Sequence, residues 1–396
     1  MATEERNLIL IQALSTFASA LASIFISVFF FRYGTFQTTM LYGISVMGSL
    51  FIWYVASGWT LRYVSSGFLM RMGLFASAIF HLLLFLLKGQ SVLYVIPLGL
   101  IQGFVQGNYW AGYNLNQYVF TNKENRAKYF GTMTSILNML QGTAPFIGGA
   151  IVSITKPYAL GNINLGYPAL FFIVSLILGA TAFTVGKLPS HETPQFSYAH
   201  IFSHKRSKHW WNLLLQQILL GLYDTSFTTI IGILFYIVVK QEISLGIVQT
   251  GTYMLGAIGS LFSIKLLRKN VRFYWIGVIG IIVGMLSFAF FQNITGILIY
   301  MIITGSTMQF LNNQLSINVL SAFDAVQGSW KEKYHLLIER DAVICLARMT
   351  SYIMLYFFLS QGNQVAQAKL WLWVIPIFVL LLGITMQKSI KMKKTL

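Results

Sequence analysis

Apolar stretches long enough to cross a lipid bilayer recur along the whole of this sequence. A membrane-spanning helix needs about 20 predominantly apolar residues. We predict twelve such spans, at 8–31, 36–58, 68–88, 91–120, 129–153, 168–186, 212–239, 243–265, 274–292, 295–322, 338–360 and 369–386. Backbone polar groups inside lipid must be satisfied within the protein, so the pattern predicts an all-α polytopic membrane protein.

The composition excludes several other classes of protein. Only 9% of the residues are charged, against about 25% in soluble proteins, which is too few to cover a water-facing surface. Cys345 is the only cysteine, so an internal disulfide is excluded. The histidines of the central loop lack acid or cysteine partners, and we find neither a phosphate-binding glycine loop nor a nucleophile triad. We therefore predict a protein that is not an enzyme and that needs no cofactor and no metal.

The basic residues are distributed unevenly between the two sides of the predicted membrane. The chain has 27 Lys and Arg against 10 Asp and Glu, a net charge of +17. Of these cations, 21 fall in the tails and even-numbered loops, five fall in the odd-numbered loops, and Arg348 lies inside a span. Positive loops face the cytoplasm, so we expect cytoplasmic termini and a multi-pass protein of the bacterial plasma membrane. The charge then indicates contact with anionic membrane lipids and not with nucleic acid.

The chain divides into two parts with six spans each. We predict an N-terminal six-helix bundle at 1–186, a cytoplasmic central loop at 187–211 and a C-terminal six-helix bundle at 212–396. Four positions on one helical face of the fourth span have counterparts 203 residues later on the tenth span. They are Gln102, Gln106, Tyr109 and Tyr113, followed by Gly305, Gln309, Asn312 and Ser316. A duplicated six-helix unit explains this correspondence, and repeated halves are typical of secondary transporters.

With six plus six spans, cytoplasmic ends and a basic central loop, the chain resembles the major facilitator superfamily. The fifth span is similar to the antiporter motif of that family. The matching positions are Gly131, Pro145, Gly148 and Gly149, whereas Leu140 and Ala144 depart from the motif. The loop between spans two and three departs further, because Arg62 stands where the family has an acid. The resemblance implies two pseudo-symmetric bundles around a cavity lined by spans one, four, seven and ten. An ordinary bent packing helix is the alternative for span five.

One acid and one base are predicted to lie deep in the membrane. Asp224 lies 12 residues after the expected start of its span (224 − 212), and Arg348 lies ten residues after the start of its own (348 − 338). A charge at the centre of a spanning helix costs at least ~2.5 kcal/mol, which favours a functional role. We predict that Asp224 couples protons, and that Arg348 is its counter-ion or holds an anionic substrate group. Alternatively, Asp224 is a structural acid and Arg348 reaches back to Asp341.

Amide and hydroxyl groups gather on the same faces of the presumed cavity helices. The predicted substrate-binding residues are Gln12, Gln102, Gln106, Tyr109, Tyr113, Asn116, Gln217, Gln309, Asn312, Asn313 and Ser316. Such groups are unsatisfied in lipid, so they face water or protein. We expect Gln106 and Gln309 to face each other across the cavity. The alternative is hydrogen bonding between helices, typically worth about 0.6 kcal/mol per contact.

These observations predict a secondary active transporter that works by alternating access. We favour proton-coupled export of a small organic molecule by a monomer, because of the partial antiporter motif and Asp224. Uptake of a neutral polar solute such as a sugar is the second possibility, because the stripes are rich in amides and intramembrane acids are scarce. A third class is a non-transporting membrane receptor or a lipid scramblase of the same fold.

Overall fold

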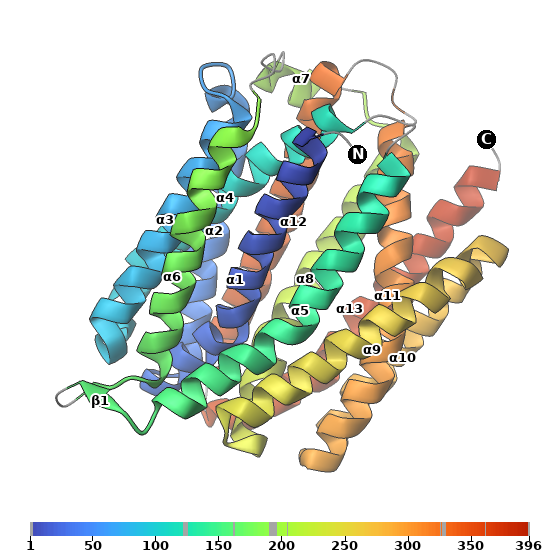
Figure 1. The fold of residues 1–396 in the computed structure, drawn as a ribbon. Helices are drawn as coiled ribbons and strands as arrows, with labels where there is room; N and C mark the ends of the chain where they lie inside the picture. The colour runs from blue at the N-terminus through green and yellow to red at the C-terminus, as the bar shows by residue number, and fades with distance from the viewer. Residues whose placement is uncertain are drawn as a thin grey trace.

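Long helices that pack side by side make up most of the molecule. The computed structural model describes residues 3–121, 126–160, 163–189, 196–203, 205–324, 326, 330–360 and 362–394 of the chain. Both chain ends and the short helix α7 (Tyr198–Ser203) lie at one end of the bundle, and a small β-hairpin lies at the other (Figure 1). We call these ends the terminal face and the opposite face.

In the part of the chain that the structure describes, twelve long helices correspond one to one with the predicted spans. Before the central segment they are α1 (Thr3–Tyr33), α2 (Phe36–Thr60), α3 (Ser66–Leu87), α4 (Val95–Phe120), α5 (Arg126–Thr155) and α6 (Gly166–Thr184). After it they are α8 (Lys208–Val239), α9 (Glu242–Lys269), α10 (Tyr274–Phe291), α11 (Ile294–Asp324), α12 (Trp330–Phe358) and α13 (Gln364–Lys394).

Short elements connect these helices. Three are 3-10 helices, η1 (Lys88–Tyr94), η2 (Val185–Lys187) and η3 (Val271–Phe273). Strands β1 (Ala159–Leu160) and β2 (Ile163–Asn164) pair antiparallel between α5 and α6. The predicted loop 187–211 is therefore partly helical, since it contains α7 and the first turn of α8.

Hydropathy and length support twelve crossings. Within the described residues, eleven stretches are long and apolar enough to span a membrane. One of them, 66–117, contains both α3 and α4 together with η1 between them, and so supplies two crossings. The prediction of an all-α polytopic fold is confirmed.

Local sequence signals set several helix ends. Thr35 caps α2 by accepting from the backbone N–H of Thr38, whose own side chain returns a bond to the Thr35 backbone. Ser207 caps α8 by accepting from the N–H of Trp210, which is why α8 begins at Lys208 and not at the predicted residue 212. These side chains satisfy backbone donors that a helix start leaves free.

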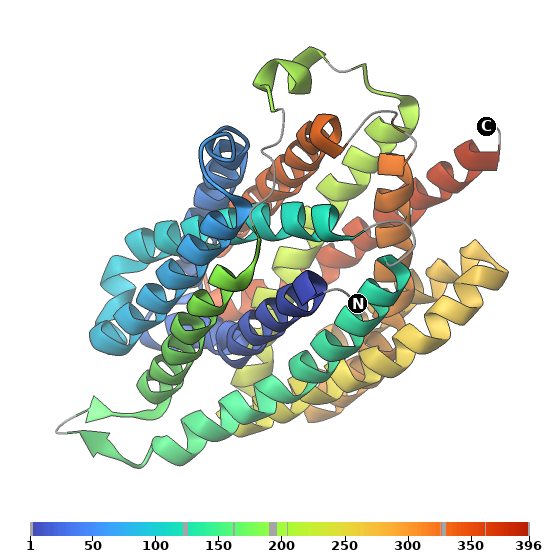
Figure 2. The same ribbon diagram turned by 45° about the horizontal axis from the view of Figure 1, so that its top comes forward.

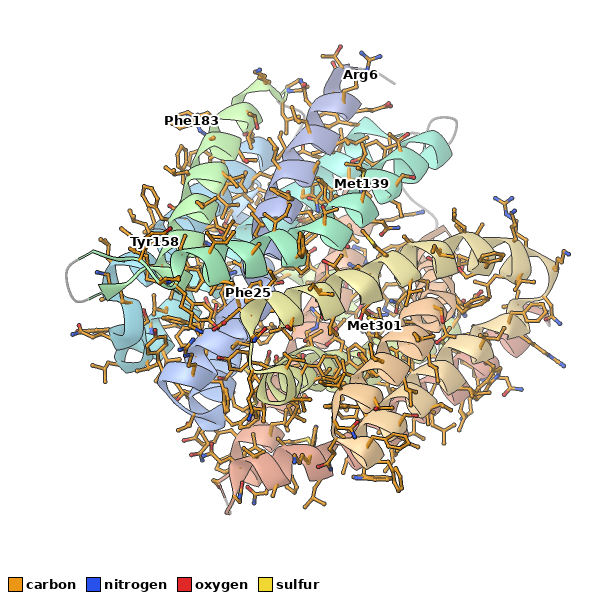
Figure 3. All side chains as sticks on the ribbon, turned by 60° about the horizontal axis from the view of Figure 1, so that its bottom comes forward. Arg6, Phe25, Met139, Tyr158, Phe183 and Met301 are labelled. Carbon is orange, nitrogen blue, oxygen red and sulfur yellow. The ribbon has the colours of Figure 1, made fainter. Side chains whose placement is uncertain are left out.

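Large apolar side chains cover the outside of the bundle as well as its interior. Phe25 is fully buried, whereas Met139, Tyr158 and Phe183 are 74%, 65% and 65% exposed (Figure 3). A soluble monomer rarely exposes so much apolar surface, but the hydrocarbon of a membrane solvates it.

Helices pack closely on one another within the part of the chain before the central segment and within the part after it. In the first part α4 packs on α2 and α3, and α5 and α6 pack on α1. In the second part α8 packs on α12 and α13, while α11 packs on α9 and α10. The two parts meet mainly where α5 runs beside α9 and where α2 runs beside α12 (Figure 2). Helices that belong to different parts therefore share two long contact lines.

Candidate functional site

The acid and the base predicted to lie deep in the membrane form an ion pair. Asp224 lies in the middle of α8, 16 residues after Lys208 and 15 before Val239. The Arg348 Nε donates to Oδ1 and Oδ2 of Asp224 at 3.1 and 3.0 Å, and a terminal guanidinium nitrogen also donates to Oδ2. Several charge-assisted bonds fix both side chains in one geometry. The predicted pairing is confirmed, and its part in proton coupling remains a prediction.

The alternative partner of Arg348 is bonded to a different arginine. Asp341 accepts two bonds from its sequence neighbour Arg340, at 2.9 and 2.6 Å from its Oδ1. The suggestion that Arg348 reaches back along α12 to Asp341 is therefore wrong. The reason is that α8 packs beside α12 and brings Asp224 to the guanidinium.

The ion pair is only partly covered by protein. The side chains of Asp224 and Arg348 keep 24% and 31% of their surface accessible. In lipid this surface would be unsolvated at a cost of several kcal/mol. Part of the polar surface of this pair is therefore not covered by other side chains of the protein.

The polar stripe on α4 is the row of side chains formed by Gln102, Gln106, Tyr109, Tyr113 and Asn116. Part of it forms hydrogen bonds with α1. The Tyr109 hydroxyl donates to Oε1 of Gln12 at 2.6 Å and lies 2.7 Å from the Ser15 hydroxyl. Tyr109 and Gln12 are both buried. Two predicted substrate-binding residues are thus brought together, but their polar atoms already satisfy each other.

Other members of the stripes also bond to neighbouring helices. Tyr113 donates to the sulfur of Met133 on α5. Asn116 is fully buried and accepts from Ser66 on α3 at 2.8 Å. Asn313 on α11 donates to Ser263 on α9 at 2.6 Å. These contacts match the interhelical alternative, so the three residues stand as weaker candidates for substrate binding.

A second group of predicted residues has amides with no side-chain hydrogen bond to a described residue. Its members are Gln102, Gln106, Gln217, Gln309 and Asn312. The Oε1 of Gln102 is buried without a partner, while Gln217 is 4% exposed. Gln309 lies against Gly256 of α9, and the exposed Ser316 donates to the Asn312 carbonyl. Among the described residues, these five amides are therefore not used to join helices, and their part in substrate binding remains a prediction.

The glycines of the motif on α5 allow two very close helix contacts. A Cβ on Gly148 would collide with the Leu21 carbonyl oxygen of α1, and one on Gly149 would lie 2.6 Å from the Glu242 carbonyl oxygen of α9. Pro145, inside α5, presents its own carbonyl to α9 at Gly246. Only hydrogen fits at positions 148 and 149, so the motif brings α5 against helices of both parts of the chain.

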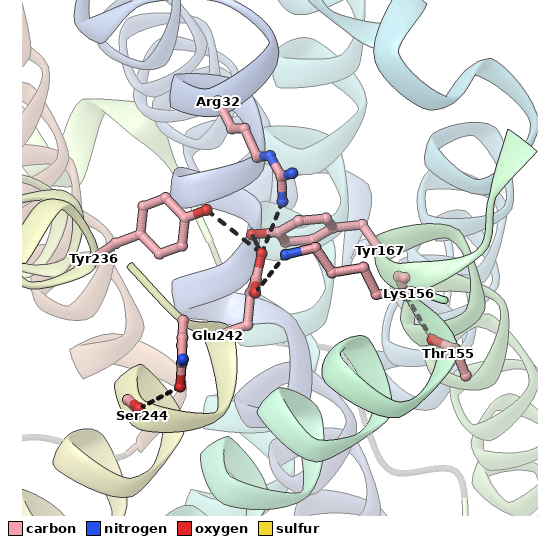
Figure 4. Close-up of polar contacts among 9 residues, drawn as sticks. Arg32, Thr155, Lys156, Tyr167, Tyr236, Glu242 and Ser244 are labelled. Carbon is pink, nitrogen blue, oxygen red and sulfur yellow. Dashed lines mark hydrogen bonds and ion pairs between the residues drawn. The ribbon is translucent and has the colours of Figure 1, made fainter. Parts of the chain in front are cut away.

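A buried acid in the first turn of α9, Glu242, is the centre of a polar network at the opposite face. Glu242 is 2% exposed and accepts from Arg32 at 2.8 Å and from Lys156 at 3.3 Å. The hydroxyls of Tyr167 and Tyr236 lie 3.4 and 3.5 Å from its Oε1 (Figure 4). The network joins α1, α6 and the end of α5 to α8 and α9. The sequence feature that could have identified Glu242 is the small number of charged residues in the odd-numbered loops, which makes an acid there unusual.

The segment between the two parts is held against α2 and α12 at the terminal face. Tyr198 of α7 donates to the Val55 carbonyl at 3.0 Å, and burial raises the pKa of this hydroxyl, so it stays protonated. Arg206 pairs with Glu339 of α12 at 2.6 Å, and the Trp210 indole donates to the same carboxylate at 3.0 Å. The segment therefore contacts both parts of the chain.

Comparison with known proteins shows which family and which solved structures this chain is similar to. Residues 8–329 match the family model described as Major Facilitator Superfamily. The nucleoside transporter NupG superposes with a TM-score of 0.68 at 13% identity, covering 98% of this chain and 100% of that one. A bacterial homologue of the iron transporter ferroportin in its inward-facing state gives 0.69 at 14%, covering 98% and 99%.

A third solved structure has a similar fold, and two uncharacterized proteins are similar in sequence. A bacterial homologue of the lysosomal transporter Spinster, inward-facing and unoccupied, gives a TM-score of 0.67 at 12% identity over 98% of both chains. The uncharacterized protein YqgE of Bacillus subtilis is 22% identical over 67% of this chain, and the match spans only 61% of YqgE. A Geobacillus stearothermophilus protein encoded in the sodM 3′ region is 24% identical over 37% of this chain and 71% of its own length.

Proposed function

The chain belongs to the Major Facilitator Superfamily, and we propose that it is a secondary transporter that exports a small organic molecule in exchange for protons. Membership of the family makes it a multi-pass membrane transporter and not an enzyme. The observation that carries the proton-coupled part is the ion pair between Asp224 and Arg348 in the middle of α8 and α12.

Protonation of Asp224 changes the charge of this site from zero to plus one. The carboxylate and the guanidinium neutralise each other while Asp224 is ionised. When a proton binds, Asp224 can no longer balance Arg348, and the guanidinium is free to take another anionic or polar partner. A proton and a substrate group can thus compete at one place, which is a simple physical basis for exchange.

Alternating access requires the closed side of the molecule to open. We propose that residues 1–186 and 212–396 move as two bundles against each other. The Glu242 network and the contact between α5 and α9 favour the state in which the opposite face is closed. Opening that face would break the ion pairs of Glu242 with Arg32 and Lys156, so these bonds would set part of the energy difference between the two states.

The unpartnered amides suggest a polar organic substrate. Gln106, Gln309 and Asn312 each offer two donors and an acceptor, which suits hydroxyl, amide or carboxyl groups. Solved structures of similar fold come from transporters of nucleosides and of iron or other metals. The donor set proposed here fits an organic solute such as a nucleoside better than a metal ion, which prefers carboxylate, imidazole or thiolate ligands.

The test is transport in proteoliposomes with the variant Asp224→Asn. A thermal-shift screen of nucleosides, sugars, organic anions and divalent cations first identifies a substrate, since a ligand that binds only the native state raises its stability. Asp224→Asn should abolish accumulation driven by a pH gradient and leave substrate exchange measurable. Asp341→Asn, which alters another acid of the same region, should retain gradient-driven transport. Wild-type accumulation by Asp224→Asn would rule out the coupling role.

Uptake of a neutral polar solute is the second candidate, and the free amides favour it. In that case transport follows the substrate gradient alone, and neither an imposed pH gradient nor Asp224→Asn changes its rate. The same proteoliposome experiment therefore separates the two functions.

A further inference from the structure

A cavity of about 520 Å³ lies at the opposite face, far along the helices from Asp224. The ends of α8 and α10, the start of α11 and the beginning of α13 enclose it. Sites for small molecules typically have volumes of about 300–1,000 Å³. Six of its eleven lining residues are apolar, among them Leu234, Phe288 and Leu372. The cavity is thus large enough for a ligand and has a mostly apolar wall.

Two lysines that line this cavity have no acidic partner among the described residues. They are Lys240, at the end of α8, and Lys369 of α13. Among the acids that the structure describes, Glu242 is the one at the opposite face, and Arg32 and Lys156 already hold it. Two positive charges therefore face one cavity, and no described carboxylate neutralises them. An anion is the chemical group that would complete this arrangement.

The start of α11 presents backbone N–H groups to the cavity, beside the C-terminal ends of α8 and α10, which carry the opposite partial charge and leave the two lysines as the main source of positive potential. Asn293 caps this helix by accepting from the backbone N–H of Gly296 at 3.1 Å, and Ile294 and Thr295 of its first turn line the cavity. The first N–H groups of a helix and its macrodipole favour negative charge. The helix start and the two lysines therefore act on the same space.

We propose that this cavity binds the phosphate headgroup of an anionic phospholipid, with the upper part of an acyl chain along its apolar wall. A small hydrophilic phosphate ion would gain nothing from six apolar side chains. Phe291, Leu370 and Trp373, which are 45%, 59% and 48% exposed, lie next to lining residues in sequence and belong to the exposed apolar surface of the bundle. A phospholipid supplies both the anion and the chain that such a wall accommodates, whereas a choline headgroup would place a cation near two lysines.

The test measures lipid binding to the detergent-purified, delipidated protein by native mass spectrometry, with thermal stability as a second readout. The probes are phosphatidylglycerol, phosphatidylcholine and inorganic phosphate. We expect phosphatidylglycerol to bind and to stabilise, phosphatidylcholine to bind at least about tenfold more weakly, and inorganic phosphate to compete poorly. Each lysine near an anionic lipid contributes about fivefold in affinity, so Lys240→Gln with Lys369→Gln should weaken phosphatidylglycerol binding about 25-fold.

Lys88→Gln is the matched control. Lys88 also follows the end of a spanning helix, α3, and also has a positive φ, 51° against 58° at Lys240, but it does not line the cavity. It should bind phosphatidylglycerol as the wild type does. Equal binding by the double variant and the wild type would overturn the proposal, as would full competition by inorganic phosphate, which indicates a site for a free anion. Should the double variant misfold, the single variants Lys240→Gln and Lys369→Gln give the same comparison.

Discussion

Removal of the Arg348 side chain is the perturbation that most directly examines the deep ion pair. Arg348→Ala leaves Asp224 with one side-chain partner among the described residues, the hydroxyl of Thr225 at 3.1 Å. At 3.0 Å and an effective dielectric constant of about 20, the lost attraction is about 5 kcal/mol before desolvation is counted. Breaking a fully buried pair costs about 3–5 kcal/mol. Because the side chains here stay 24% and 31% exposed, we expect a loss of about 2–4 kcal/mol.

The assay is a double-mutant cycle read from unfolding of the detergent-solubilised protein. Asp224→Asn removes the charge with little change of shape, so in the Arg348→Ala background it should recover part of the lost stability. The expected coupling energy is about 1–3 kcal/mol. Arg272→Ala, which removes an exposed arginine of the same part of the chain, is the control and should change stability by less than about 0.5 kcal/mol. Additive losses in the double variant would show that the two residues do not stabilise each other, and the reasoning would fail.

Three further predictions concern the opposite face and the amides. Glu242→Gln should leave the guanidinium of Arg32 and the ammonium of Lys156 without a counter-charge and lower the stability by about 1–2 kcal/mol. It should also make the opposite face more accessible to a water-soluble label, and unchanged labelling would argue that these ion pairs do not keep that face closed. Gly149→Ala should lower the midpoint temperature of unfolding and the transport rate, because its Cβ would lie 2.6 Å from a backbone oxygen and overpacking costs about 1–3 kcal/mol. Gly186→Ala is the control and should be neutral, because a Cβ at that position would have nothing within 4 Å. In a variant lacking the native cysteine, Gln106→Cys and Gln309→Cys should react with a small hydrophilic thiol reagent and be protected by substrate; two unreactive sites in every state would assign these amides to packing.

The sequence by itself determined the number of spans and most helix ends to within five residues, whereas α12 begins eight residues before its predicted start and α13 ends eight residues after its predicted end. This follows because the length of a spanning helix is set by the thickness of the hydrocarbon and its ends by local side chains such as Ser207. It also predicted that Asp224 and Arg348 lie far from the ends of their helices, because distance along a helix can be counted residue by residue.

The tertiary structure alone decided which of the polar groups meet. Arg348 and Asp224 are 124 residues apart and Arg32 and Glu242 are 210 apart, and no local pattern fixes how the corresponding helices pack. The same is true of the stripe on α4, where Tyr109 is used by Gln12 while Gln106 has no such partner among the described residues. Helical periodicity gives the face on which a side chain lies, but the neighbour on that face depends on contacts between distant helices. The similar depths of Asp224 and Arg348 along their helices led to the prediction that they pair, and the packing of α8 on α12 brings them together. No such signal marked Glu242 as the centre of a network that joins both parts of the chain.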